Sequence, residues 1–180
     1  QGGAQAKYDV KPDITCFGKV IGGGLPIGAI GGSRAVMENL TPIGKVFHAG
    51  TLAGNPLATA AGLAALNELT QDVYMELGAR ARALSTLLRD ACLSAGIVAQ
   101  FPVVGTLVGA FFGPNTPTNF DEAKQTDEKM YARFFHAMLA EGVALAPGAY
   151  EALFVGLGHT DSVMQQLAER AQRAAHAAVL

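Results

Sequence analysis

The chain contains, between residues 17 and 32, the stretch Phe17-Gly18-Lys19-Val20-Ile21-Gly22-Gly23-Gly24-Leu25-Pro26-Ile27-Gly28-Ala29-Ile30-Gly31-Gly32. The short run just before Lys19, Ile14-Thr15-Cys16-Phe17, favours a β-strand. Because apolar residues and glycines flank Lys19 on both sides, we expect its amine to be buried. A buried amine is costly as a cation, and its neutral form is nucleophilic toward aldehydes. The stretch therefore predicts a reactive lysine among glycines that let a flat cofactor come close.

These residues alone leave a second interpretation of Lys19 open. The side chain could instead extend from a glycine-rich turn into water, as exposed lysines do. The three glycines at 22–24 do not form a phosphate loop of the Gly-x4-Gly-Lys-Ser/Thr type, because that spacing is absent. We expect them to shape the turn that follows Lys19.

A resemblance to a known family decides between the two interpretations. The run Tyr8-Asp9-Val10-Lys11-Pro12-Asp13, together with residues 17–29, resembles the cofactor-lysine segment of class III aminotransferases, which use pyridoxal 5'-phosphate. The resemblance implies an α/β enzyme of PLP-dependent transferase fold type I, the aspartate-aminotransferase-like fold. It also implies that residues 1–70 end the large PLP-binding domain. Residues 71–180 would then form a linking helix and a small C-terminal α+β domain.

Three further runs resemble the glutamate-1-semialdehyde aminomutase branch of that family. They are Gly2-Gly3-Ala4-Gln5, Ala49-Gly50-Thr51-Leu52-Ala53-Gly54-Asn55-Pro56-Leu57-Ala58 and Ala146-Pro147-Gly148-Ala149-Tyr150-Glu151. The branch implies an isomerase that converts glutamate 1-semialdehyde to 5-aminolevulinate for tetrapyrrole (porphyrin) synthesis. The alternatives are another class III ω-aminotransferase, or a non-catalytic fragment of either enzyme. Because family members are much longer, we expect this chain to be inactive on its own.

The resemblance also assigns roles to individual residues. Lys19 would bond covalently to the cofactor aldehyde and, once released by substrate, carry protons as a general base. Gly50 and Thr51 would bind the cofactor phosphate, and the family's matching threonine reaches the cofactor of the other subunit, which implies a homodimer. Glu151 would lie near the substrate carboxylate. The alternatives are that Thr51 only satisfies its own backbone and that Glu151 is an exposed turn residue.

Composition excludes several other classes of protein. The net charge of −2 and the lack of a basic cluster argue against nucleic acid as a partner. The sequence contains no run of about 18 uncharged apolar residues, so we expect no membrane span. Cys16 and Cys92 lie far apart, and no histidines have metal-ligand spacing, so we expect neither a disulfide framework nor a metal. We expect Cys16 to fill space as a small apolar residue within a strand. We also expect the substrate to be a small amino-aldehyde and the protein to be cytoplasmic.

Capping residues and apolar periodicity predict the order of the elements. Helices are predicted to start after Ser33, at Asn55-Pro56, after Asp72, after Asp127 and after Thr160, with Gly96 and Gly142 ending two of them. Strands are predicted at 14–17, 25–30, 97–101, 106–112, 143–145 and 153–157, with a polar loop at 119–126.

Overall fold

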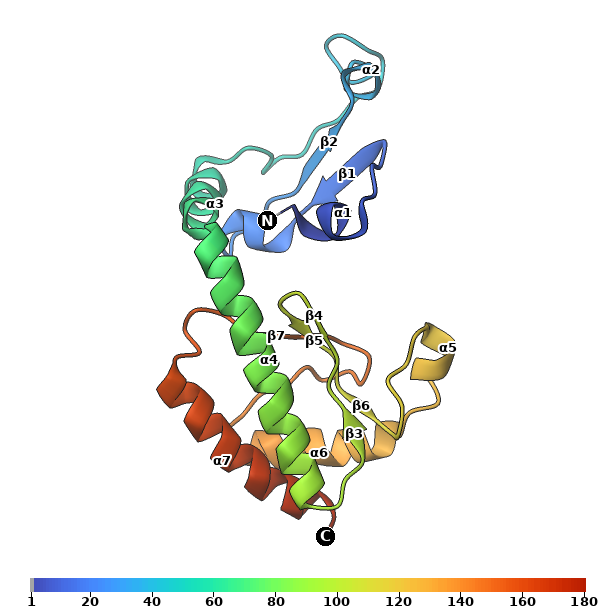
Figure 1. The fold of residues 1–180 in the computed structure, drawn as a ribbon. Coiled ribbons are helices and arrows are strands. Elements are labelled where there is room, and N and C mark those ends of the chain that lie inside the picture. Colours follow the sequence, from blue (N-terminus) through green and yellow to red (C-terminus); the bar gives the residue numbers. More distant parts are fainter. Residues whose placement is uncertain (1) are drawn as a thin grey trace. The chain divides into compact units, whose positions relative to one another are not determined.

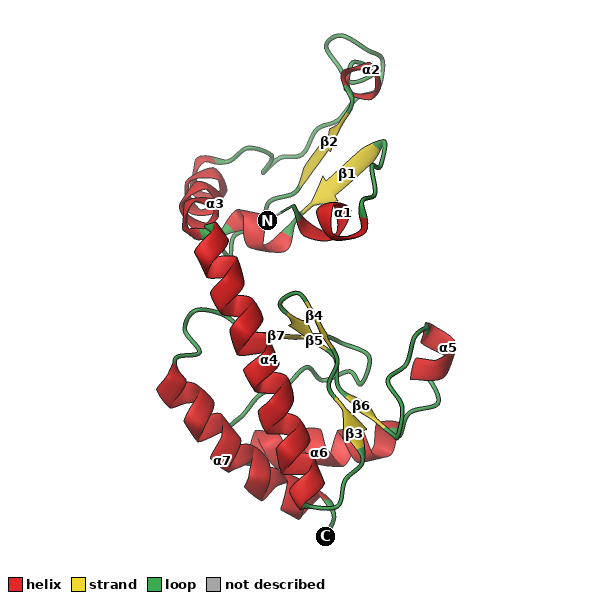
Figure 2. Ribbon diagram, viewed as in Figure 1, coloured by secondary structure: helices red, strands yellow, loops and turns green. Residues whose placement is uncertain are grey.

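The computed structural model describes residues 2–180, which divide into two compact units, Gln1–Val73 and Tyr74–Leu180. The division falls inside the long helix α4, Gln71–Ser94 (Figure 1). The assignment of residues 1–70 to a large domain and 71–180 to a small domain stays a prediction. Each unit is mixed helix and strand (Figure 2), in keeping with the predicted fold class.

The N-terminal unit is built on a two-stranded antiparallel sheet. Strand β1, Ile14–Phe17, pairs with β2, Ala29–Gly32, so that Phe17 lies opposite Ala29. The first predicted strand is confirmed, but the second starts four residues later than predicted. Residues 22–25 instead form a turn, with Gly23 and Gly24 at positive φ, and Pro26 has no N–H to give to a sheet. The unit also contains α1, Gly3–Tyr8, the 3₁₀ helix η1, Lys19–Gly22, and α2, Arg34–Met37.

Helix α3, Pro56–Glu68, packs directly on η1 and so supports the segment that carries Lys19. The predicted start of α3 is confirmed, because the Asn55 side chain accepts a hydrogen bond from the Ala58 N–H at 2.9 Å and Pro56 is the first helical residue. A Cβ on Gly62 would lie far inside contact distance of the Ile21 carbonyl oxygen. The two backbones therefore approach as closely as they do only because residue 62 is glycine.

The C-terminal unit combines most of α4 and three further helices with two small antiparallel sheets. Strand β3, Ala99–Gln100, pairs with β6, Phe111–Phe112, and the second sheet has the order β4-β5-β7. The bounds of the remaining elements are Val103–Val104 for β4, Leu107–Val108 for β5, Phe120–Ala123 for α5, Glu128–Ala140 for α6, Leu153–Phe154 for β7 and Asp161–Ala178 for α7.

Five of the local predictions for residues 70–145 are corrected by the structure. The strand predicted at 97–101 shortens to β3, and the strand predicted at 106–112 divides into β5 and β6 at residues 109–110. Between them lies the unpredicted strand β4, which follows Pro102 and pairs with β5 across a hairpin at Gly105, where φ is +64°. Residues 143–145 are not a strand. The predicted loop 119–126 contains α5, and Thr70, not Asp72, caps α4 by accepting a bond from the Val73 N–H.

The core of this unit lies between α4, α6, α7 and the strands. Its largest fully buried side chains are Phe134, Leu88, Met138, Val108 and Cys92. The fully buried residues of helix α7 are all small, namely Ala171, Ala174, Ala175 and Ala178, while Met164 and Leu167 pack partly buried against the core. Small side chains let α6 and α7 approach closely.

The two cysteines differ in burial, and this difference gives a testable expectation. Cys92 is fully buried, and burial raises the pKa of its thiol to about 12. Cys16 is exposed on β1, so the prediction that it fills space within a strand is wrong. A thiol reagent should label Cys16 quickly and Cys92 only on unfolding, as peptide mass spectrometry would show. Because the unfolded thiol ionises first, the stability contributed by Cys92 should fall between about pH 9 and 12.

Candidate active site

Lys19 lies at a sharp change of backbone direction. Strand β1 ends at Phe17, Gly18 is fully extended, and Lys19 has φ +56° as the first residue of η1. Among residues 2–180, Asp9 is the one other non-glycine residue at positive φ. Such a conformation costs on the order of 1–3 kcal/mol in a residue with a side chain, and strained residues of this kind cluster at functional sites.

The predicted burial of Lys19 is wrong. The side chain is exposed, and its apolar neighbours Phe17 and Val20 are themselves 52% and 59% exposed. Because these neighbours lie on the surface of the unit, they cannot remove water from the amine. Within residues 2–180 the amine forms no ion pair and no hydrogen bond, so no described side chain blocks access to it.

A pocket of about 680 Å³ lies where the end of β1 meets the loop 48–54. We call it the β1–loop pocket, and it is lined by Cys16, Phe17, residues 26–30, residues 48–50 and residues 52–54. It brings the predicted phosphate-binding residue Gly50 beside the strand that leads into Lys19. Lys19 and Thr51 do not themselves line it, although each lies within two residues of one that does.

The loop that carries Gly50 and Thr51 is held by its own backbone. The Ala53 N–H donates to the Gly50 carbonyl at 2.9 Å, and the Asn55 side-chain amide donates to the Leu52 carbonyl at 3.0 Å. These bonds fold the loop but use neither the N–H of Gly50 nor that of Thr51. Both N–H groups are therefore available to an anion.

The hydroxyl of Thr51 is also available. Within the described residues it makes no hydrogen bond, whereas the Thr59 hydroxyl donates to the Asn55 carbonyl at 2.5 Å and the Thr126 hydroxyl to the Ala123 carbonyl at 2.7 Å. Thr51 thus does not satisfy its own backbone, which was the alternative interpretation. A hydroxyl and two N–H donors are the kind of donor set that fits a phosphate group.

Glu151 belongs to the C-terminal unit and closes a tight turn. Its Oε1 accepts a hydrogen bond from the Gly148 N–H at 2.9 Å, and its own N–H donates to the Gly148 carbonyl at 3.1 Å. A Cβ at residue 148 would lie 2.6 Å from that Oε1, so the Glu151 carboxylate would have to move if residue 148 carried a side chain. Glu151 is exposed, and its Oε2 has no partner among residues 2–180. One carboxylate oxygen thus shapes the turn and the other is free for a ligand.

Two tyrosines anchor this turn to α6. Neither was predicted from the sequence to be a site residue. The Tyr131 hydroxyl donates to the Ala146 carbonyl, and the Tyr150 hydroxyl donates to the Glu128 carboxylate. Burial, and next the negative charge of Glu151, raise the pKa of Tyr131. No local pattern in the sequence signals these contacts, because each joins residues at least 15 positions apart.

The described residues hold neither a candidate metal cluster nor a candidate membrane-spanning helix. Across residues 2–180, no three His, Cys, Asp or Glu side chains are grouped closely enough to hold a metal ion. None of the helices described there has the length and apolar character needed to cross a membrane.

Comparison with known proteins places this geometry in a family. The model of the class III aminotransferases matches residues 2–172. The chain belongs to the class III aminotransferase family. It is 50% identical over 161 residues to the glutamate-1-semialdehyde 2,1-aminomutase of Desulfosudis oleivorans, covering 89% of this chain and 38% of the relative. It is 47% identical over 179 residues to the protein of the same name from Pelotomaculum thermopropionicum, covering 99% and 41%.

Solved structures of the family confirm the predicted fold. The structure of a β-phenylalanine aminotransferase from Variovorax paradoxus superposes with a TM-score of 0.83 at 29% identity, over 94% of this chain and 40% of that one. The chain thus spans about two fifths of the length of the class III proteins that it matches.

Proposed function

We propose that this chain supplies the lysine segment and the C-terminal domain of a pyridoxal-phosphate-dependent isomerase that converts glutamate 1-semialdehyde to 5-aminolevulinate. The observation that carries the proposal is the identity of 47–50% with proteins named for that reaction, over 89–99% of this chain. The β1–loop pocket supports it, because Gly50 and Phe17 line it, and these residues are followed closely in the chain by the free hydroxyl of Thr51 and the unpaired amine of Lys19.

When bound, pyridoxal phosphate stabilises the electron pair left on carbon after a proton is removed beside an amino group. Lys19 is the residue that would hold the cofactor covalently, and its free amine would then carry the proton between the two carbons that exchange the amino group. Thr51 and Gly50 would bind the phosphate through the donors that the loop leaves unused. The free oxygen of Glu151 would pair with a cationic group that binds the substrate carboxylate.

The proposal includes a cytoplasmic homodimer whose product feeds tetrapyrrole synthesis. Support for a covering subunit comes from α3 and the loop before it, where Leu57 is 75% exposed and Phe47 is 80% exposed. A helix that is apolar on its outer as well as its inner face is normally covered by protein. The two free cysteines agree with a reducing compartment.

An activity assay separates this proposal from its alternatives. By full-length enzyme we mean the polypeptide that carries these residues within a chain of its relatives' length. We expect it to form 5-aminolevulinate from glutamate 1-semialdehyde with no external amino acceptor. Product formation only with an added acceptor would favour an ω-aminotransferase. The structural similarity to a β-phenylalanine aminotransferase supports that alternative. The non-catalytic fragment would be favoured if the native polypeptide had a mass near 18.6 kDa and was inactive in both assays.

Thr51→Ala gives a more local test of the phosphate site. The variant should keep the covalent bond between Lys19 and the cofactor but lose about 1–3 kcal/mol of cofactor affinity, the value of a hydrogen bond to a charged group. Equilibrium dialysis against pyridoxal phosphate measures this loss. The matched control is Thr59→Ala, since the Thr59 hydroxyl is engaged by the Asn55 carbonyl and should not bind cofactor. Equal affinities in the two variants would remove Thr51 from the site.

A further inference from the structure

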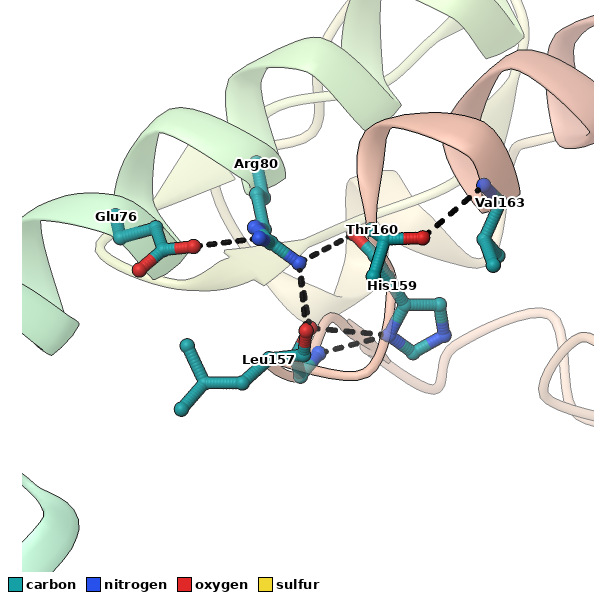
Figure 3. Close-up of polar contacts among 7 residues, drawn as sticks. Glu76, Arg80, Leu157, His159, Thr160 and Val163 are labelled. Carbon is teal, nitrogen blue, oxygen red and sulfur yellow. Dashed lines mark hydrogen bonds and ion pairs between the residues drawn. The ribbon is translucent and has the colours of Figure 1, made fainter.

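Arg80 is held at the centre of a cluster of carbonyl groups in the C-terminal unit (Figure 3). Its side chain projects from α4 and is only 18% exposed. Its Nη1 donates to the Leu157 carbonyl at 2.8 Å, to the Gly156 carbonyl at 3.5 Å and to the His159 carbonyl. Its Nη2 pairs with the Glu76 carboxylate at 2.5 Å. A single guanidinium therefore binds three carbonyls of one short loop.

The loop that Arg80 binds, residues 156–159, is also closed on itself. The Gly156 N–H donates to His159 Nδ1 at 2.9 Å, and the His159 N–H donates to the Gly156 carbonyl at 3.1 Å. Within this closed loop the Leu157 and His159 carbonyls both accept from Arg80 Nη1, because a guanidinium nitrogen carries two hydrogens and can donate to more than one acceptor. Charge-assisted bonds of this kind are stronger than neutral ones, so Arg80 fixes the loop on α4.

The same loop ends the segment that carries Glu151. Between Glu151 and residue 156 lies only β7, which pairs with β5 over two residues, Leu153 and Phe154. Strands this short hold little by themselves. The segment 146–159 is held to α6 near its start by Tyr131 and Tyr150, and Leu153 is buried in the core. Arg80 is what holds its far end, after β7.

We propose that Arg80 is a positioning residue for Glu151, acting through the loop 156–159 and β7. It never touches the substrate. Its role is to fix the far end of the segment so that the 148–151 turn presents the free Glu151 oxygen in one orientation. The proposal rests on the proposed function for its effect on catalysis, but its effect on the turn can be measured separately.

Amide hydrogen exchange tests the positioning itself. In Arg80→Gln we expect the Glu151 amide, which donates to the Gly148 carbonyl, to exchange at least about tenfold faster than in the parent chain. Arg80→Lys should restore part of the protection. The control is Arg82→Gln, two residues along α4, because Arg82 is exposed and forms no hydrogen bond within residues 2–180. Faster exchange confined to 156–160, with Glu151 unchanged, would overturn the proposal.

Kinetics of the full-length enzyme test the consequence. Arg80→Gln should raise KM for glutamate 1-semialdehyde by about tenfold and change kcat less than twofold, since only binding of the carboxylate is impaired. Glu151→Gln should raise KM alike, and Arg82→Gln should not. An unchanged KM in Glu151→Gln would refute the proposed role of Glu151 in substrate binding. The exchange experiment would still test whether Arg80 positions the 148–151 turn. An unchanged KM in Arg80→Gln alone would overturn the inference.

Discussion

Replacing Lys19 by alanine in the full-length enzyme should lower turnover by orders of magnitude and leave folding nearly unchanged. Turnover falls because the same amine would provide both the covalent anchor and the proton carrier. Stability should change by only about 0.5 kcal/mol, because the side chain is exposed and without a hydrogen bond or ion pair in residues 2–180. Alanine also keeps the unfavourable positive φ that lysine already has.

Borohydride reduction followed by peptide mass spectrometry measures the covalent part of this effect. The parent enzyme should retain the cofactor on the peptide that contains Lys19, and the alanine variant should retain none. Lys45→Ala is the matched control, because Lys45 is also an exposed lysine of the N-terminal unit, outside the β1–loop pocket. Near-normal turnover in Lys19→Ala would refute the assigned role.

Gly62→Ala should destabilise the N-terminal unit by at least about 1–3 kcal/mol, the usual cost of inserting atoms where none fit. The added Cβ would meet the Ile21 carbonyl, which is backbone and cannot turn aside as a side chain would. Helix η1 must then shift on α3, and Lys19 is the first residue of η1. The variant should therefore also lose covalent cofactor binding, although residue 62 lies outside the pocket lining.

The chain offers a matched control in Gly78→Ala. Gly78 is likewise a buried glycine inside a helix, but a Cβ there would meet Arg82 Nη1 at 3.6 Å and the Gly105 carbonyl at 3.8 Å, both ordinary contacts. With space available, alanine should stabilise α4 by up to about 1 kcal/mol through its better helix propensity. Urea unfolding with exchange at amides of η1 and α3 measures both variants. If Gly62→Ala and Gly78→Ala were equally stable, the contact between η1 and α3 at Gly62 would have room for a Cβ, which would contradict this prediction.

The sequence by itself determined the family and several helix boundaries. Helix starts at Asn55-Pro56, Asp127 and Thr160 were predictable because a cap acts within three residues of its own position. Strand β1 and the helix-ending glycines, Gly96 and Gly142, followed from equally local rules. Of the two strands predicted between 97 and 112, the first shortened to two residues and the second broke at residues 109–110, so that its two halves pair in different sheets.

Only the tertiary structure decided the properties of the candidate site. Exposure of Lys19, wrongly predicted as burial, depends on what packs around the end of β1, and the flanking residues do not contain that information. The free hydroxyl of Thr51 depends on how its whole loop folds. Arg80 meets carbonyls 76 to 79 residues away, a distance that no local pattern spans. Local structure follows from short-range sterics and hydrogen bonds, whereas a site is made by segments that meet only after the chain has folded.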